Sequence, residues 1–256
     1  MAKLSDKLWV WGHPTNAFEN KWSITKKSFM SPGDGIKWLG GRNVFYIPTS
    51  YAVDPDEQVR LLDDMQTVGW SLKPDNLDMV IALGKKYKNM KIGILDDFFN
   101  VENENNYLKY PPEVLRELAE RLHKEGMELW MVVYSKHFRS DMCPPVDMRE
   151  YFKEFDGVTF WFWNEGEIEF YEERINDFFE QTKGIRKMIG CYLYNFGDEI
   201  PSNIEPTIYQ LEKALEYLKE GKFEGLIMHT NCVLDIGHEV PNVARDWLAM
   251  HLDDEL

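Results

Sequence analysis

Short apolar runs alternate with segments of helical periodicity along the whole sequence, and this alternation limits the possible folds more than any other feature. The apolar runs are too short for buried helices and carry few charges, which predicts strands that are buried on both faces. Eight such strands are expected, at residues 8–12, 43–47, 69–72, 92–95, 129–134, 157–163, 188–194 and 225–229. We expect the third to be short or irregular. Helices are expected at residues 32–39, 56–68, 75–88, 111–124, 148–155, 168–182, 206–219 and 240–252.

Strands that alternate with helices in this way form parallel sheets. Eight units favour a closed barrel over an open doubly wound sheet, so we predict an α/β protein in which residues 1–256 form a single (β/α)8 TIM-barrel domain. No Gly-rich phosphate-binding loop follows any expected strand, so the sequence does not favour a dinucleotide-binding fold. No cofactor is expected.

Charge and cysteine usage disfavour several classes of partner. The formal net charge of −15 argues against nucleic acid and against an anionic membrane surface. No apolar run reaches the roughly 18 to 20 residues that span a bilayer. Cys143, Cys191 and Cys232 are odd in number and far apart, which predicts neither a disulfide framework nor a zinc site. Residues 1–6 do not read as a signal peptide, and both the cellular location and the oligomeric state stay open.

Residues 91–99, Lys-Ile-Gly-Ile-Leu-Asp-Asp-Phe-Phe, place two adjacent carboxylates at the end of a buried strand. Neighbouring strand residues point to opposite faces, so one of Asp96 and Asp97 should face the barrel axis and the other the wall. A carboxylate in that position loses hydration and needs a partner or a function. The alternative is an aspartate that caps the next loop.

Polar and aromatic residues gather at one end of the expected strands. A (β/α)8 barrel carries its active site at the C-terminal ends of its strands. The opposite ends supply mainly Lys, Arg, Gly and Met, and because this asymmetry was not used to place the strands it supports the barrel independently. The residues that follow the strands include His13, Thr49, Tyr51, Asp96, Asp97, Tyr134, Lys136, His137, Trp163, Asn164, Glu165, Asn195, Asp198, Glu199, His229 and Asn231.

This combination of side chains suits a sugar. Two carboxylates across a sugar ring can divide the acid and the nucleophile or base roles of glycoside hydrolysis. Aromatic rings stack on the apolar face of a sugar, while Asn and His bind its hydroxyls. The predicted substrate is therefore a saccharide or glycoside. The catalytic candidates are Asp96, Asp97, Glu165, Asp198 and Glu199, and the substrate-binding candidates are His13, Tyr134, Lys136, Trp163, Asn164, Asn195, His229 and Asn231.

Several of these candidates also have a purely structural explanation. Asp198 and Glu199 precede an Ile-Pro pair and could form a solvated turn. Glu165 lies at the start of a helix, where the helix dipole favours acids in any case. His229 could be a hydrogen-bonded core histidine. We prefer Asp198 or Glu199 to Glu165 as the partner of the aspartates at the fourth strand, because the seventh strand is placed more firmly.

Parts of the sequence resemble TIM-barrel proteins of the glycoside-hydrolase type, many of them uncharacterised. The similar segments are residues 96–99, 190–198, 209–211 and 225–229, within a likeness that spans residues 90–250. In one large clan of these enzymes the acid/base follows the fourth strand, which corresponds here to Asp96 or Asp97. The nucleophile follows the seventh strand, which corresponds to Asp198 or Glu199. This chain lacks that clan's Asn-Glu pair after the fourth strand, and a second group, with carboxylates after the fourth and sixth strands, would favour Glu165. The resemblance implies carbohydrate hydrolysis and leaves the pair open.

Two other functions compete with hydrolysis. A metal-dependent TIM-barrel hydrolase or isomerase could use His13, Asp97, His137 and His229 as ligands of a divalent ion. No HxH motif after the first strand and no HExxH motif supports it, and the prediction includes no metal. A sugar-binding protein without catalysis would keep the aromatic rings and use the carboxylates only as hydrogen-bond acceptors.

Overall fold

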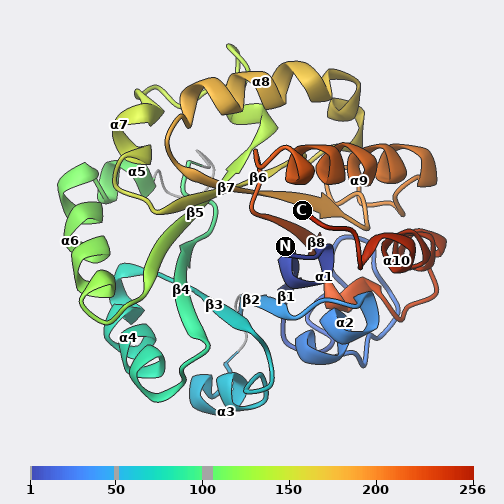
Figure 1. Cartoon of the computed structure of the whole chain (residues 1–256), viewed down its shortest axis with the longest axis horizontal. Helices are drawn as coiled ribbons and strands as arrows, with labels where there is room; N and C mark the ends of the chain where they lie inside the picture. Colours follow the sequence, from blue (N-terminus) through green and yellow to red (C-terminus); the bar gives the residue numbers. More distant parts are fainter. Residues whose placement is uncertain (1, 49–51, 100–105) are drawn as a thin grey trace.

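The strands close into a parallel barrel in chain order, as the sequence predicted (Figure 1). The structure is a computed structural model that describes residues 2–48, 52–99 and 106–256. The strands are β1 (Leu8–Gly12), β2 (Asn43–Tyr46), β3 (Thr67–Ser71), β4 (Met90–Leu95), β5 (Glu128–Tyr134), β6 (Gly157–Trp161), β7 (Arg186–Tyr192) and β8 (Gly225–His229). The α-helices are α1 (Leu4–Lys7), α2 (Pro32–Leu39), α3 (Pro55–Arg60), α4 (Leu77–Lys86), α5 (Asn106–Lys109), α6 (Pro112–His123), α7 (Met148–Phe152), α8 (Tyr171–Gln181), α9 (Ile204–Lys219) and α10 (Glu239–His251). Short 3₁₀ helices are η1 (Pro74–Asn76), η2 (Ser135–Phe138), η3 (Glu165–Phe170) and η4 (Asn231–Val233).

Proline and glycine residues mark the ends of the helices in the outer ring, as α6 illustrates. In α6, Pro112 occupies the first turn, where a missing N–H costs nothing. Leu115, Leu118 and Leu122 are buried and form the apolar stripe that faces the barrel. Gly126 follows with a left-handed φ of 68°, which a glycine adopts without strain. The chain then turns directly into β5.

The segment before β3 differs from the expected helix over residues 56–68. Asp54 caps α3 by accepting a hydrogen bond from the backbone N–H of Asp56, but the helix ends at Arg60. Thr67 and Val68 instead pair with β2, because these β-branched residues gain cross-strand packing there. The register of β3 against β4 then shifts after Val68. The third strand is therefore displaced towards the N-terminus and irregular.

Large rings fill the barrel interior and lie against glycines of neighbouring strands. A methyl group on Gly190 of β7 would overlap the indole of Trp161 on β6. Gly225 of β8 is in the same way crowded by Trp9 of β1. Trp11 and Trp161 meet across the interior with ring centroids 5.4 Å apart. These indoles form a solid floor beneath the C-terminal mouth of the barrel.

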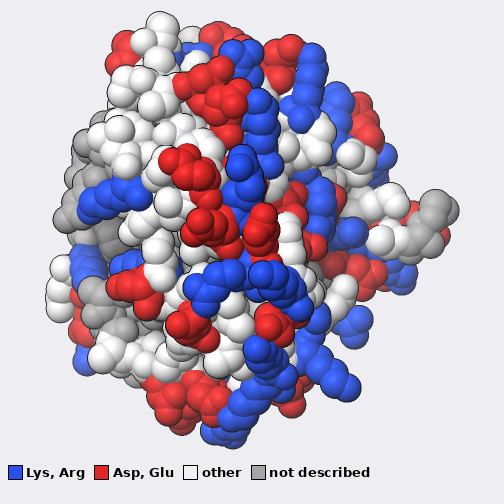
Figure 2. Space-filling model, turned by 90° about the vertical axis from the view of Figure 1, so that its left-hand side faces the viewer, with Lys and Arg blue, Asp and Glu red and all other residues white. Residues whose placement is uncertain are grey.

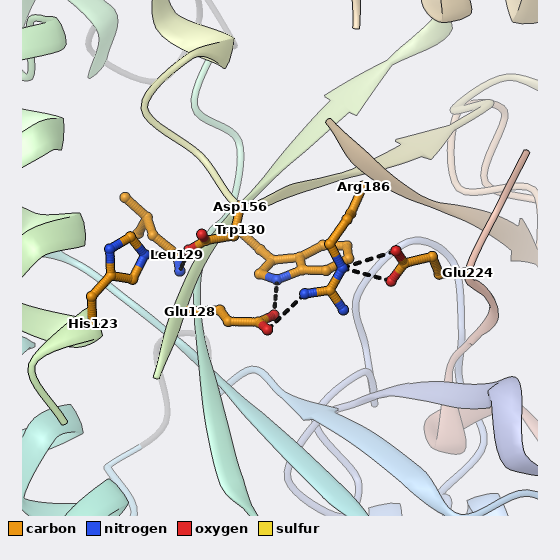
Figure 3. A network of polar contacts seen from close by, with 7 residues as sticks. All are labelled: His123, Glu128, Leu129, Trp130, Asp156, Arg186 and Glu224. Atoms are coloured by element: carbon orange, nitrogen blue, oxygen red, sulfur yellow. Dashed lines mark hydrogen bonds and ion pairs between the residues drawn. The ribbon is translucent and has the colours of Figure 1, made fainter. Parts of the chain in front are cut away.

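An arginine links three strands at the N-terminal end of the barrel (Figure 3). Arg186, the first residue of β7, donates to Glu128 of β5 at 2.6 Å and to Glu224, just before β8, at 2.7 Å. Its guanidinium also lies 5.3 Å from the ring centroid of Trp130, whose indole N–H donates to Glu128. This network holds the end of the barrel opposite the catalytic candidates.

Ion pairs cover the outer surface around α4, α6 and α7. Figure 2 shows this face with acidic and basic side chains interspersed, so no large area of it carries a single sign of charge. The pairs there include Arg116 with Glu154 and Lys85 with Glu125. Across residues 2–48, 52–99 and 106–256, no helix combines the length and the apolar character that a membrane crossing requires.

Candidate active site

A cavity of about 250 Å³ opens among the C-terminal ends of the strands. We call it the central cavity. It brings together seven of the residues predicted from the sequence, which are His13, Asp96, Asp97, Tyr134, Lys136, Trp163 and His229. Its other lining residues are Trp11, Phe18, Trp22, Val132, Trp161, Tyr192 and Phe196.

The two aspartates follow β4 directly and both face this cavity. The backbone N–H of Asp97 donates to Oδ1 of Asp96 at 3.0 Å, which turns the chain sharply after Leu95. Asp97 takes a left-handed φ of 52° in this turn. The hydroxyl of Tyr134, the last residue of β5, donates to Oδ1 of Asp97 at 2.8 Å. The turn therefore presents both carboxylates, and the tyrosine fixes one of them.

The environment of Asp96 disfavours its ionised form. Burial, and then the neighbouring negative charge of Asp97, raise the pKa of Asp96 well above its ordinary value. Burial also raises the pKa of Tyr134 and of Tyr192 beside it, so both phenols keep their protons and can donate hydrogen bonds. A carboxyl with a raised pKa is suited to donate a proton as a general acid.

Two buried histidine rings line the cavity. Nδ1 of His13 donates to the carbonyl of Ile47 at 3.0 Å, and burial lowers the pKa of His13 to about 3. Nε2 of His13 is therefore an unprotonated acceptor, and it has no hydrogen-bond partner in the described part of the chain. Burial, with a smaller effect of His13, lowers the pKa of His229, whose Nδ1 also lacks a described partner. The two ring centroids are 5.5 Å apart.

Three rings from loops close one side of the cavity, and we call Phe18, Trp22 and Phe196 the aromatic wall. Phe18 lies edge-on to Trp22 at 4.7 Å and to Phe196 at 5.5 Å. The hydroxyl of Tyr194 donates to the carbonyl of Trp22 at 2.7 Å and anchors the loop after β1. No periodic pattern in the sequence indicated these loop residues.

The aromatic residues that point into the barrel could have been identified from the sequence, because alternate residues of a strand point to the same face. Trp161 lies two residues before Trp163 and shares its face of the strand. It is fully buried in the floor, where its N–H donates to Thr159, and it also lines the central cavity. Trp11 on β1 and Tyr192 on β7 line the cavity as well.

The carboxylates predicted after the seventh strand lie outside the central cavity. Asp198 is exposed and accepts a hydrogen bond from the side-chain amide of Asn195 at 2.9 Å. The carbonyl oxygen of the same amide accepts from the backbone N–H of Asp198. Glu199 is exposed as well and accepts from the hydroxyl of Ser23 at 3.0 Å. These contacts fit the solvated turn that was the structural alternative.

The remaining candidates are held by the scaffold. Glu165 accepts hydrogen bonds from the backbone and side chain of Asn203, at the start of α9. The amide of Asn231 is fully buried and binds both backbone groups of His13, so it positions that histidine from outside the cavity. Asn164 lies against the backbone of Gly197. Thr49 and Tyr51 fall outside the described residues.

The predicted set of metal ligands is not assembled in one place. His137 does not line the central cavity, and its Nδ1 accepts the backbone N–H of Tyr134 at 3.2 Å. Among the residues that the structure describes, no group of three or more His, Cys, Asp or Glu side chains could hold a metal ion.

A second hollow adjoins the aspartates on their other side, and we call it the open cleft. It measures about 860 Å³ and shares Asp96 and Asp97 with the central cavity. Residues that follow β3 and β4 supply most of its polar lining, which includes Ser71, Lys73, Asp75, Asn76, Asn106 and Lys109.

Comparison with known proteins identifies the fold alone. No protein-family model and no curated protein matches the sequence. A GH18 chitinase from Pseudoalteromonas aurantia aligns with a TM-score of 0.54 and 10% identity over 96% of this chain and 100% of the other. A GH113 beta-1,4-mannanase aligns with a TM-score of 0.54 and 10% identity over 97% of this chain and 99% of the other. A xylose isomerase-like TIM barrel protein from Mycobacterium smegmatis, in complex with magnesium, aligns with a TM-score of 0.50 and 12% identity over 98% of each chain.

Proposed function

We propose that this protein is a glycoside hydrolase in which Asp96 is the general acid and Asp97 the charge-stabilising carboxylate. The observation that carries the proposal is the pair of adjacent carboxylates at the end of β4, in different environments, between an aromatic cavity and an open cleft. Glycosidases keep a general acid protonated by an environment that raises the pKa of that carboxyl group.

The proposed reaction needs only water as a second reactant. Asp96 transfers its proton to the bridging oxygen as the bond from that oxygen to the anomeric carbon breaks. The electron pair of that bond leaves with the oxygen as an alcohol. The negative charge of Asp97, held by the Tyr134 hydroxyl, stabilises the positive charge that develops on the sugar. Water then bonds to the anomeric carbon, and its proton returns to the Asp96 carboxylate.

Residues that line the central cavity would contact the ring and the hydroxyl groups of the sugar. The Trp163 ring is half-buried and lines it, which suits stacking on a sugar face. The imidazole rings of His13 and His229 line the same cavity. Asp198, Glu199 and the other candidates held outside the cavity have no part in this assignment.

The test compares Asp96→Asn and Asp97→Asn with the wild type on a panel of fluorogenic and alkyl monoglycosides. Loss of a general acid typically costs about 10²- to 10⁴-fold. The loss in Asp96→Asn should be smaller for the aryl substrates, because an aryloxide leaves without a proton. Asp63→Asn, on the exposed surface after α3, is the matched control and should keep full activity.

Three outcomes would overturn this assignment. Full activity of Asp96→Asn excludes its role as acid. Inactivation by Asp198→Asn or Glu199→Gln alone would move the chemistry to the loop after β7. Saccharide binding without hydrolysis by the wild type would show a sugar-binding protein instead.

A further inference from the structure

On the basis of the proposed glycosidase activity, we infer that the enzyme acts from a chain end. The central cavity takes one terminal sugar residue, and the open cleft takes the rest of the substrate as leaving group. The aspartates line both spaces, so the bond to be cleaved lies where the two spaces meet.

The sizes of the two spaces support this division. Pockets for drug-sized ligands measure about 300 to 1,000 Å³. The central cavity, at about 250 Å³, falls below that range and suits a single ring. The open cleft, at about 860 Å³, has room for a much larger group.

The aromatic wall stands opposite the open cleft. Its rings come from the loops after β1 and β7, and Phe18 and Phe196 lie against His229 at the end of β8, with ring centroids 6.0 and 4.8 Å from that imidazole. The cleft is lined by residues after β2, β3 and β4. In a closed barrel of this strand order, β3 and β4 lie across from β7 and β8. A sugar that reaches the aspartates from the cleft therefore meets the wall with its far end.

The His13 ring also borders the cavity beside the wall. It lines the central cavity and lies 4.7 Å from Phe18, while its Nε2 is buried. A terminal residue needs no space beyond these rings, whereas an internal residue would have to continue past them.

The test uses the full chain and follows products over time. The monoglycoside panel first identifies the sugar that is hydrolysed. Oligosaccharides of that sugar, three to six units long and labelled at the reducing end, are then digested. Action from the chain end gives the monosaccharide as the only unlabelled product and shortens the labelled chain by one unit at a time. Methylation of the hydroxyl groups of the non-reducing terminal residue should abolish cleavage.

Unlabelled products of two or more units at the earliest times would overturn the inference and leave the glycosidase assignment intact. A wild type that hydrolyses no glycoside would overturn both.

Trp22→Gly gives a second readout, because Trp22 has a left-handed φ of 47° that glycine adopts freely. Opening the wall should raise KM for the monoglycoside roughly 2- to 10-fold, as expected for one aromatic contact, and allow short oligosaccharides among the first products. Trp38→Ala, whose ring lies under Arg245 on the outer surface, is the control and should change neither. Unchanged products from a folded Trp22→Gly, with methylated chains still cleaved, would also contradict the inference.

Discussion

Replacing Asp96 by Asn should make the protein more stable at neutral pH while it removes most of the activity. Burial, together with the charge of Asp97, raises the pKa of Asp96 in the folded protein. The ionised form of Asp96 is therefore less favourable in the folded state than in the unfolded chain. Asparagine keeps nearly the same shape and removes the charge.

The size of the effect follows from proton linkage. Below about pH 3.9 the carboxyl is protonated in both states, and the wild type bears no penalty. As the pH rises, the unfolded chain ionises first, and the wild type loses stability until the folded-state pKa is passed. Above the folded-state pKa, each unit by which it exceeds the unfolded-state pKa lowers the free energy of unfolding by about 1.4 kcal/mol. For a chain of this size, that cost corresponds to about 3 to 5 °C in Tm per unit.

Thermal unfolding of the wild type and Asp96→Asn, measured at intervals from pH 4.5 to 8.5, gives the assay. The Tm advantage of the variant should be small at the acid end and grow with pH, while Asp63→Asn follows the wild type throughout. A lower Tm for Asp96→Asn at pH 7.5, or a difference that does not change with pH, would refute the reasoning.

Three further predictions concern other parts of the structure. Because burial lowers the pKa of His13 to about 3, its imidazole should stay neutral with the proton on Nδ1 from pH 8 down to pH 5; an imidazolium signal in long-range ¹H–¹⁵N NMR at pH 6 would contradict this. Gly190→Ala should lower stability by about 1 to 3 kcal/mol in denaturant unfolding, because the added methyl overlaps an indole, whereas Gly166→Ala, with open space around it, should change little. Arg186→Met leaves two carboxylates without their shared arginine and should lower the free energy of unfolding by about 1 to 2 kcal/mol, a loss that decreases in high salt. The control Arg121→Met removes a single exposed pair and should lower it by under about 1 kcal/mol. Equal losses in the two variants would argue against the network.

The barrel could be predicted because each strand is recorded locally as a short apolar run. The strand-end rule then located Asp96, Asp97 and Tyr134, since a residue directly after a strand has little freedom to face elsewhere. The boundary near Thr67 was wrong for a non-local reason. Val59, Leu62 and Met65 follow helical spacing, but pairing with β2 decides where the strand begins.

The rest of the site depends on the paths of loops, which no periodic pattern records. Asp198, a few residues past its strand, can satisfy its hydrogen bonds within its own turn, as it does with Asn195. Conversely, Phe18 and Trp22 come from an irregular segment and reach the cavity only because the loop folds back and is anchored by Tyr194. Polar residues close to a strand end are predictable, and those further along a loop are not.

The left-handed turn at Asp97 limits how this site can change during evolution. Asp, Asn and Gly adopt that backbone conformation at the lowest cost. The single substitutions that keep the turn at the lowest cost therefore replace the carboxylate by an amide or by nothing, whereas Glu keeps the charge at a higher backbone cost. Descendants of this chain could lose the charge at this position in one step and keep both the barrel and the cavity. Under the proposed function, such a lineage would pass readily from hydrolysis to sugar binding.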